Sequence, residues 1–308
     1  MIQKEDLRSQ GSGQSRSLDV PATPGVGVDL GATLAKIAIL EADQEGGESA
    51  SPCTRFELLP AAALPRIASR VEFLAPASVG LTGGGAADLA KRLSCASAQV
   101  NEFAAWGFGA ARLLESNGSQ PREPYLLVSL GTGTSVLLVD GMSVTRTGGT
   151  ALGGGTVMGL AVAMMGSTDF DELCRLAAKG SSGAVDLHIS DIYQAGEYPL
   201  GRDLTASAFG KLARQREEDP EAGSVSREDL AAAVMGLVGE NVALICGGLA
   251  SAAQVREIVF AGSTLRSNSA LIAVLRQVTE ALGRRATFLP HGEFAGALGC
   301  LELARARS

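Results

Sequence analysis

Residues 144–159, VTRTGGTALGGGTVMG, combine six glycines and four threonines with a single charged side chain, that of Arg146. Glycine loses more conformational freedom on folding than any other residue, so such a run indicates close approach of the backbone to another group. The glycines lead into an apolar helical pattern, and a glycine-rich loop that opens a helix can wrap a phosphate chain. Arg146 presents a planar, permanently charged fork that suits a carboxylate or a transferring phosphoryl group. The alternative for Arg146 is a surface ion pair.

Two segments share a pattern that predicts β-hairpins. Residues 25–40 and 125–141 each consist of an apolar run, a turn of small residues and a second apolar run. The turns, Gly31-Ala32-Thr33 and Gly131-Thr132-Gly133, expose backbone N–H groups and threonine hydroxyls, which together can bind an anion. The simpler interpretation is that both are tight structural hairpins.

Charged side chains accompany the first of these turns. Lys36 follows it by three residues and can reach a phosphate. Asp29 ends the preceding strand and can hold Mg²⁺ directly or through water. In the simpler interpretation Asp29 only caps the turn.

Glu102 is the candidate general base. Asn101 is a plausible N-cap and places Glu102 in the first turn of a helix, where the helix dipole favours the ionised carboxylate by roughly 0.3–1 kcal/mol. A carboxylate at the mouth of a cleft can accept a hydroxyl proton, which accelerates a reaction by about 10²–10⁴-fold. From spacing alone, the favoured interpretation is that Glu102 only serves the N-terminus of its helix.

The composition limits the classes of function. The 308 residues carry a net charge of −7, so no basic face for nucleic acid is expected. Five cysteines stand far apart, which argues against a disulfide framework or a zinc site and suits a reducing cytoplasm. Residues 1–24 are polar and predict a disordered leader without a signal peptide. Residues 230–253 approach membrane length, but Glu240 and Asn241 at their centre favour a buried helix of a soluble protein.

Strands and helices alternate along the chain, which predicts an α/β fold with sheets covered by helices. The paired hairpins suggest two similar lobes with a cleft between them. We expect the first lobe to span residues 25–120 and the second residues 121–308.

Four segments together resemble the type II pantothenate kinases of the actin/sugar-kinase/Hsp70 superfamily: VDLGATLAK (28–36), LTGGGA (81–86), residues 129–159, and FAGSTLRSN with FLPHGEFAGALG (260–268 and 288–299). The resemblance implies two RNase H-like lobes with mixed sheets in an actin-like ATPase fold. It also implies phosphorylation of pantothenate by ATP and Mg²⁺ in a cytoplasmic homodimer, with a dimer contact in the second lobe.

The resemblance also assigns roles to residues. Glu102 would be the base, Arg146 would hold substrate and the developing phosphoryl charge, and Asp29 would hold the metal. The residues that would contact ATP are Asp29, Gly31, Ala32, Thr33, Lys36, Thr132, Gly154, Gly155, Thr156, Val157, Met158, Phe170 and Ser263. Those that would contact pantothenate are Ser135, Arg146, Thr205 and Ala206.

The chain departs from the family pattern at two places. Ala32 stands where the first loop usually has glycine, which would be costly if that position needs a positive φ. Ala104 replaces an acidic residue two positions after the base, and Trp106 and Phe108 on the same helix are bulky. These two alanines support a second hypothesis, a nucleotide-binding pseudo-kinase. A third, an amino-sugar or hexose kinase of the same superfamily, stays open because Asn101-Glu102 resembles the Asn-Asp pair of such kinases.

Overall fold

The computed structural model describes residues 6–7, 24–42, 52–119, 124–194, 204–218 and 225–306. The predicted leader over residues 1–24 lies almost wholly outside this part of the chain, as does the predicted lobe boundary at residues 120–123.

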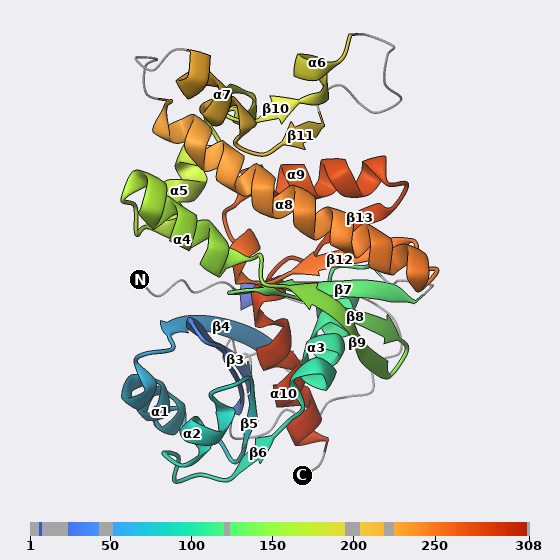
Figure 1. The fold of residues 1–308 in the computed structure, drawn as a ribbon. Helices are drawn as coiled ribbons and strands as arrows, with labels where there is room; N and C mark the ends of the chain where they lie inside the picture. Colours follow the sequence, from blue (N-terminus) through green and yellow to red (C-terminus); the bar gives the residue numbers. More distant parts are fainter. Residues whose placement is uncertain are drawn as a thin grey trace.

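The first sheet has six strands, and the antiparallel pair predicted for residues 25–40 forms its centre (Figure 1). β2 and β3 form this hairpin, β4 continues it in antiparallel fashion, and β5 and β6 follow in parallel on the other side of β2. In spatial order the strands are β1 (Asp6–Leu7), β4 (Pro52–Pro60), β3 (Leu34–Ala42), β2 (Gly25–Leu30), β5 (Val79–Thr82) and β6 (Ser97–Gln99).

The second sheet repeats this layout. Its hairpin of β7 and β8 is the one predicted from residues 125–141, β9 continues it in antiparallel fashion, and β12 and β13 lie parallel to β7. In spatial order the strands are β9 (Ser143–Thr150), β8 (Thr134–Asp140), β7 (Tyr125–Leu130), β12 (Glu257–Ala261) and β13 (Arg285–Phe288). The shared topology confirms the prediction of two similar α/β lobes.

Helices cover both sheets and lie between them (Figure 1). The first half of the chain contributes α1 (Leu64–Phe73), α2 (Ala86–Ala90) and α3 (Glu102–Ser116). The second half contributes α4 (Gly154–Met165), α5 (Phe170–Ala177), α8 (Arg227–Ala252), α9 (Ser269–Ala281) and α10 (Ala295–Arg305), with short 3₁₀ turns η2 (Ser263–Leu265) and η3 (Gly292–Phe294). A small subdomain lies beyond α8 and consists of η1 (Ser182–Ala184), β10 (Leu187–His188), α6 (Ile189–Ile192), β11 (Thr205–Ser207) and α7 (Gly210–Glu218).

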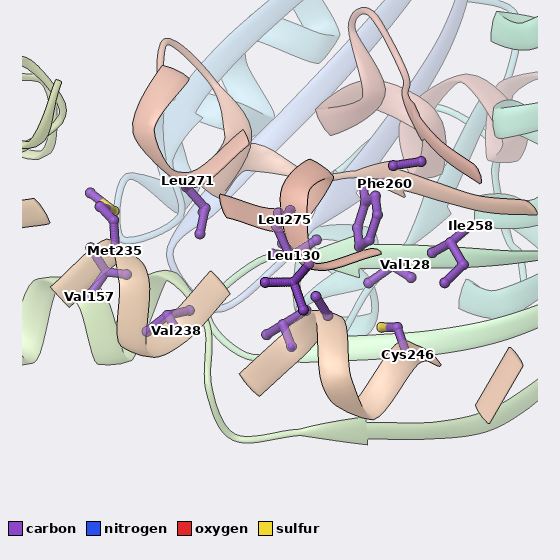
Figure 2. Packing of buried hydrophobic residues seen from close by; sticks show 14 of the residues in the cluster. Val128, Leu130, Val157, Met235, Val238, Cys246, Ile258, Phe260, Leu271 and Leu275 are labelled. Atoms are coloured by element: carbon purple, nitrogen blue, oxygen red, sulfur yellow. The ribbon is translucent and has the colours of Figure 1, made fainter. Parts of the chain in front are cut away.

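The core of the second lobe lies between its sheet and the helices above it. Figure 2 shows aliphatic side chains from β7 and α8 packed together with Phe260 of β12. α8 is long and apolar enough to span a membrane by length and composition, but 61% of its most apolar stretch is buried inside the protein. It is therefore a core helix, as the polar residues at its centre predicted.

The last helix returns to the first lobe. α10 packs against β2 and β5 and, most closely, against α3. Gly109 of α3 and Gly299 of α10 meet at this contact, where a Cβ on either residue would collide with backbone of the other helix. Side chains of both sheets, including Phe56 and Leu137, join α3 and α10 in one hydrophobic cluster. The second lobe is thus tied to the first by the C-terminal end of the chain.

Candidate active site

Both hairpin turns line one cavity of about 640 Å³. The start of α3, strand β9, the starts of α4 and α5 and the segment after β12 contribute to its lining. Most residues predicted to contact ligands line this cavity. They are Asp29, Gly31, Ala32, Thr33, Lys36, Glu102, Thr132, Ser135, Arg146, Gly154, Gly155, Met158, Phe170 and Ser263.

The tips of both turns carry backbone donors without partners. The first glycine of each turn closes it, Gly31 donating to the carbonyl of Leu34 at 3.1 Å and Gly131 to that of Gly133 at 2.9 Å. In the described part of the chain, no hydrogen bond is made by the backbone N–H groups of Ala32, Thr33, Thr132 and Gly133. Unpaired N–H groups at a tight turn form a site for an anion.

Asp29 and Lys36 form a buried ion pair beside the first turn. The Nζ atom of Lys36 lies 3.5 Å from Oδ2 of Asp29, and both side chains are almost fully buried. Burial raises the pKa of Asp29, and the positive charge of Lys36 opposes this effect. Among the described residues there is no cluster of three metal ligands, and the only carboxylates that line the cleft are Asp29 and Glu102.

Glu102 occupies the position predicted from sequence. Asn101 caps α3 by accepting a hydrogen bond from the N–H of Ala104 at 3.1 Å, and Glu102 is the first residue of the helix. The net direction of its pKa differs from the expectation based on the helix dipole. Desolvation in the cleft and the nearby charge of Asp29 raise the pKa of Glu102, against a smaller effect of Lys36. A raised pKa makes the carboxylate a stronger base.

Arg146 reaches the cleft from a β-bulge in β9. Leu137 pairs with Arg146 and Val136 with Gly148, so Thr147 is the extra residue. The guanidinium crosses Gly149, where a Cβ would stand 2.9 Å from Nη2. Arg146 makes no ion pair in the described part of the chain, which argues against the surface ion-pair interpretation.

The glycines after Arg146 serve close backbone contacts. Those of TGGT lie in β9, although the sequence suggested a loop. The N–H groups of Gly154 and Gly155 donate to the carbonyls of Gly131 and Thr132, both at 2.8 Å. A Cβ on Gly154 would come within 2.6 Å of the hydroxyl of Thr264. The start of α4 therefore supports the second turn, and these two N–H groups are not available to wrap a phosphate as predicted.

A comparison with family profiles shows the family to which this chain belongs. The profile of the Fumble protein family matches residues 66–302. The chain belongs to the Fumble family.

Curated relatives of this Fumble chain carry the description type II pantothenate kinase. The chain is similar to the protein of Oceanobacillus iheyensis, with 32% identity over 277 residues that cover 90% of this chain and 98% of the relative. It is also similar to the protein of Staphylococcus saprophyticus, with 31% identity over 281 residues that cover 90% of this chain and 99% of the relative. These matches confirm the resemblance inferred from the four sequence segments.

Solved structures confirm the actin-like ATPase fold. Component A of the (R)-2-hydroxyglutaryl-CoA dehydratase of Acidaminococcus fermentans has a TM-score of 0.61 at 19% identity, covering 93% of this chain and 100% of that one. A ROK family glucokinase from Streptomyces griseus, in complex with glucose and AMPPNP, has a TM-score of 0.53 at 13% identity, covering 92% and 99%. At these identities the likeness concerns the fold alone.

Four predicted contact residues of this Fumble-family chain do not line its cavity. The hydroxyl of Thr156 donates to the carbonyl of Ala151 at 3.1 Å and helps to cap α4, and Val157 is fully buried in the core. Thr205 and Ala206 lie in β11 of the small subdomain, where the hydroxyl of Thr205 donates to Oε1 of Glu240 at 2.7 Å. These two residues therefore lie outside the lining of the cleft, and their contact with pantothenate stays a prediction.

Arg266 lines the cleft and was not predicted from the sequence. It follows Ser263 in the turn after β12, and its Nη2 lies 3.6 Å from Oδ1 of Asp171. Its buried Nε has no hydrogen-bond partner among the described residues. Its place could have been predicted from the sequence, because ligand sites of α/β folds lie at the carboxyl ends of parallel strands, and β12 ends just before this turn.

Proposed function

We propose that this protein transfers the terminal phosphoryl group of ATP to the primary hydroxyl of pantothenate and thereby forms 4′-phosphopantothenate, the first step of coenzyme A biosynthesis. The observation that carries the proposal is the convergence of Glu102, Arg146 and both hairpin turns on one cleft. The proposal is also supported by curated relatives described as type II pantothenate kinases, which the chain matches over nearly their whole length.

Glu102 would accept the proton of the primary hydroxyl. The hydroxyl oxygen then forms a bond to the γ-phosphorus while the bond from that phosphorus to the bridging oxygen breaks and ADP leaves. The raised pKa of Glu102 suits this role. Arg146 would stabilise the charge that develops on the transferred group, because its fork can donate two hydrogen bonds at once.

The turns would hold the nucleotide phosphates through their unpaired N–H groups and the hydroxyls of Thr33 and Thr132. Mg²⁺ is usually bound by one or two carboxylates together with substrate phosphates, and Asp29 at the edge of the first turn fits this pattern. Bound there, the ion would neutralise phosphate charge. Met158, Phe170, Ser263 and Arg266 line the side of the cleft formed by the second lobe and would contact the rest of the nucleotide.

The departures at Ala32 and Ala104 do not favour a pseudo-kinase. Ala32 is not among the described residues with a positive φ, so its side chain causes no backbone strain in this turn. Ala104 does not line the cleft, and its N–H is used by the cap of α3. The structural likeness to a glucokinase does not favour a sugar acceptor either, because it extends only to the fold.

One assay tests the function. The purified protein is given ATP and Mg²⁺ with pantothenate, N-acetylglucosamine, glucose or no acceptor, and ADP release is followed. ADP release that depends on pantothenate supports the proposal. Release that depends on a sugar, or nucleotide binding without turnover, would overturn it.

We also propose that the enzyme acts as a cytoplasmic homodimer. The support is the resemblance to type II pantothenate kinases, together with exposed apolar side chains on α8, where Leu244 is 53% and Ile245 36% exposed. Burying such side chains against a second copy is favourable. Sedimentation velocity measures the assembly, and a monomer at micromolar concentration would contradict this part of the proposal.

A further inference from the structure

Trp106 occupies a distinctive place in the cleft. It lies four residues after Glu102 on α3, and side chains four apart in a helix project from the same face. These two are the residues of α3 that line the cavity. Trp106 is also the single tryptophan of the sequence. The helix that carries the proposed base therefore places one large aromatic side chain beside it.

The indole is held rigidly. It is 5% exposed and packs in the cluster between the lobes, together with Phe56, Leu137 and partly buried Val144. A Cβ on Gly296 of α10 would stand 2.9 Å from Nε1 of Trp106 and 2.8 Å from Oδ2 of Asp29. The only polar atom of the indole thus lies close to Asp29, and the remaining ring atoms are carbon. The ring forms a fixed, mainly apolar wall.

Pantothenate carries an apolar group next to its reacting hydroxyl that can pack against such a wall. Its reacting hydroxymethyl group is attached to a quaternary carbon that bears two methyl groups. If the hydroxyl oxygen lies about 2.6–3.2 Å from the carboxylate of Glu102, these methyl groups lie only three bonds from that oxygen. One turn of helix rises about 5.4 Å, so a side chain one turn away from Glu102 can contact them.

We propose that Trp106 is a specificity-determining residue that selects acceptors with a branched, apolar carbon next to the reacting hydroxymethyl group. The proposal rests on the proposed function and adds which part of the substrate Trp106 recognises. Sugars carry hydroxyl groups near the reacting carbon, and a hydroxyl turned against the indole would lose hydrogen bonds to water without replacement. The same wall therefore accepts pantothenate and disfavours sugars.

The first experiment compares two acceptors, pantothenate and its analogue in which both methyl groups are replaced by hydrogen. Loss of one methyl group from an apolar site typically costs about 10–200-fold in kcat/KM. The wild-type enzyme should therefore prefer pantothenate at least tenfold. Trp106→Ala should reduce this preference at least fivefold, whereas Trp106→Phe should keep most of it. Phe108→Ala, on the same helix but outside the cleft lining, is the matched control and should leave the preference unchanged.

A preference that is unchanged in Trp106→Ala overturns the proposal while leaving pantothenate phosphorylation intact. If the wild-type enzyme does not phosphorylate pantothenate at all, the proposed function fails and this inference fails with it. The two failures are therefore distinguished by the wild-type enzyme alone.

A second measurement needs no variant and remains decisive if Trp106→Ala does not fold. Because the sequence has one tryptophan, its fluorescence reports only the environment of Trp106. Pantothenate added to the wild-type enzyme with ADP should change this emission, with the demethylated analogue requiring at least tenfold higher concentration. Saturation with pantothenate without any change in emission, or equal half-saturation by both compounds, contradicts contact between the indole and the methyl groups.

Discussion

The hydroxyl oxygens of Thr33 and Thr132 lie 3.0 Å apart, although 99 residues separate them in sequence. Each belongs to the turn of a hairpin at the centre of its own sheet, so the hydrogen bond joins the two lobes at the proposed phosphate site. Both side chains are exposed to the cleft. The contact is thus made by the same hydroxyls that would turn toward phosphate when a nucleotide is bound.

Replacing either threonine with valine should weaken ATP use selectively. A hydrogen bond to a charged group contributes about 1.5–3 kcal/mol, so Thr33→Val or Thr132→Val should lower kcat/KM for ATP about tenfold or more. The KM for pantothenate should change little. Steady-state kinetics with each substrate varied in turn measures this, and Thr33→Ser, which keeps the hydroxyl, is the control. An unchanged kcat/KM for ATP in both valine variants would exclude the hydroxyls as phosphate ligands.

Glu102→Gln should lower kcat a hundredfold or more while ATP affinity stays close to the wild-type value, because only proton acceptance is lost. The pKa of Glu102 is raised above its usual 4.5, so wild-type kcat/KM should fall with decreasing pH through a pKa higher than that value. The folded protein disfavours the charge, so the variant should be at least as stable as the wild type at pH 7. This difference should vanish below about pH 4.5.

Glu115→Gln is the matched control for Glu102→Gln. It makes the same substitution near the end of the same helix, where Glu115 is exposed and pairs with Arg112 at 3.2 Å. It should have wild-type kinetics. Normal turnover by Glu102→Gln itself would remove Glu102 from the mechanism.

Arg146→Lys should lower kcat/KM at least tenfold although the charge is kept. Lysine cannot reproduce the two-pronged donation of arginine, and the bulge at Thr147 aims the side chain at one place in the cleft. Arg112→Lys, an exposed arginine on α3, is the control and should have no effect. Single-turnover kinetics separates phosphoryl transfer from product release. Wild-type transfer rates in Arg146→Lys would show that the guanidinium is not needed.

The parts of the site that sequence could predict depend on local patterns. The hairpins follow from apolar runs around small residues, and the position of Glu102 follows from the cap at Asn101. The parts that it missed depend on contacts between distant segments. No local signal shows that Gly154 and Gly155 donate to the second turn, or that α10 returns to the first sheet. The place of Trp106 on the same helix face as Glu102 follows from their spacing of four residues, whereas its burial against residues of both sheets and α10 does not.

The contact between α3 and α10 should not tolerate a side chain at Gly109. A Cβ there would collide with the carbonyl oxygen of Ala295, and backbone cannot move aside as a flexible side chain can. Gly109→Ala should lower the free energy of unfolding by about 1–3 kcal/mol or more. Gly159→Ala, also within a helix but with nothing within 4 Å, should instead stabilise by about 0.4–1 kcal/mol. Urea unfolding measures both, and equal effects would contradict the packing.

The buried pair of Asp29 and Lys36 should make stability depend on pH once it is broken. Lys36→Gln removes the charge that lowers the pKa of Asp29, so the pKa in the folded state rises further above its usual 3.8. When a carboxyl group has a higher pKa in the folded state than in the unfolded state, the protein loses stability as the pH rises above the unfolded-state pKa. Breaking a buried pair costs about 3–5 kcal/mol, and this loss should be larger at pH 8 than at pH 5.

Adding Asp29→Asn to Lys36→Gln should recover most of this stability, because no uncompensated charge then remains in the buried site. Lys91→Gln is the control, since it breaks an exposed pair with Asp88 at 2.9 Å and should change stability little at either pH. Urea unfolding at pH 5 and pH 8 measures all of these variants. If Lys36→Gln lost the same stability at both values, its effect would come from packing, and the ionised state of Asp29 would not depend on Lys36.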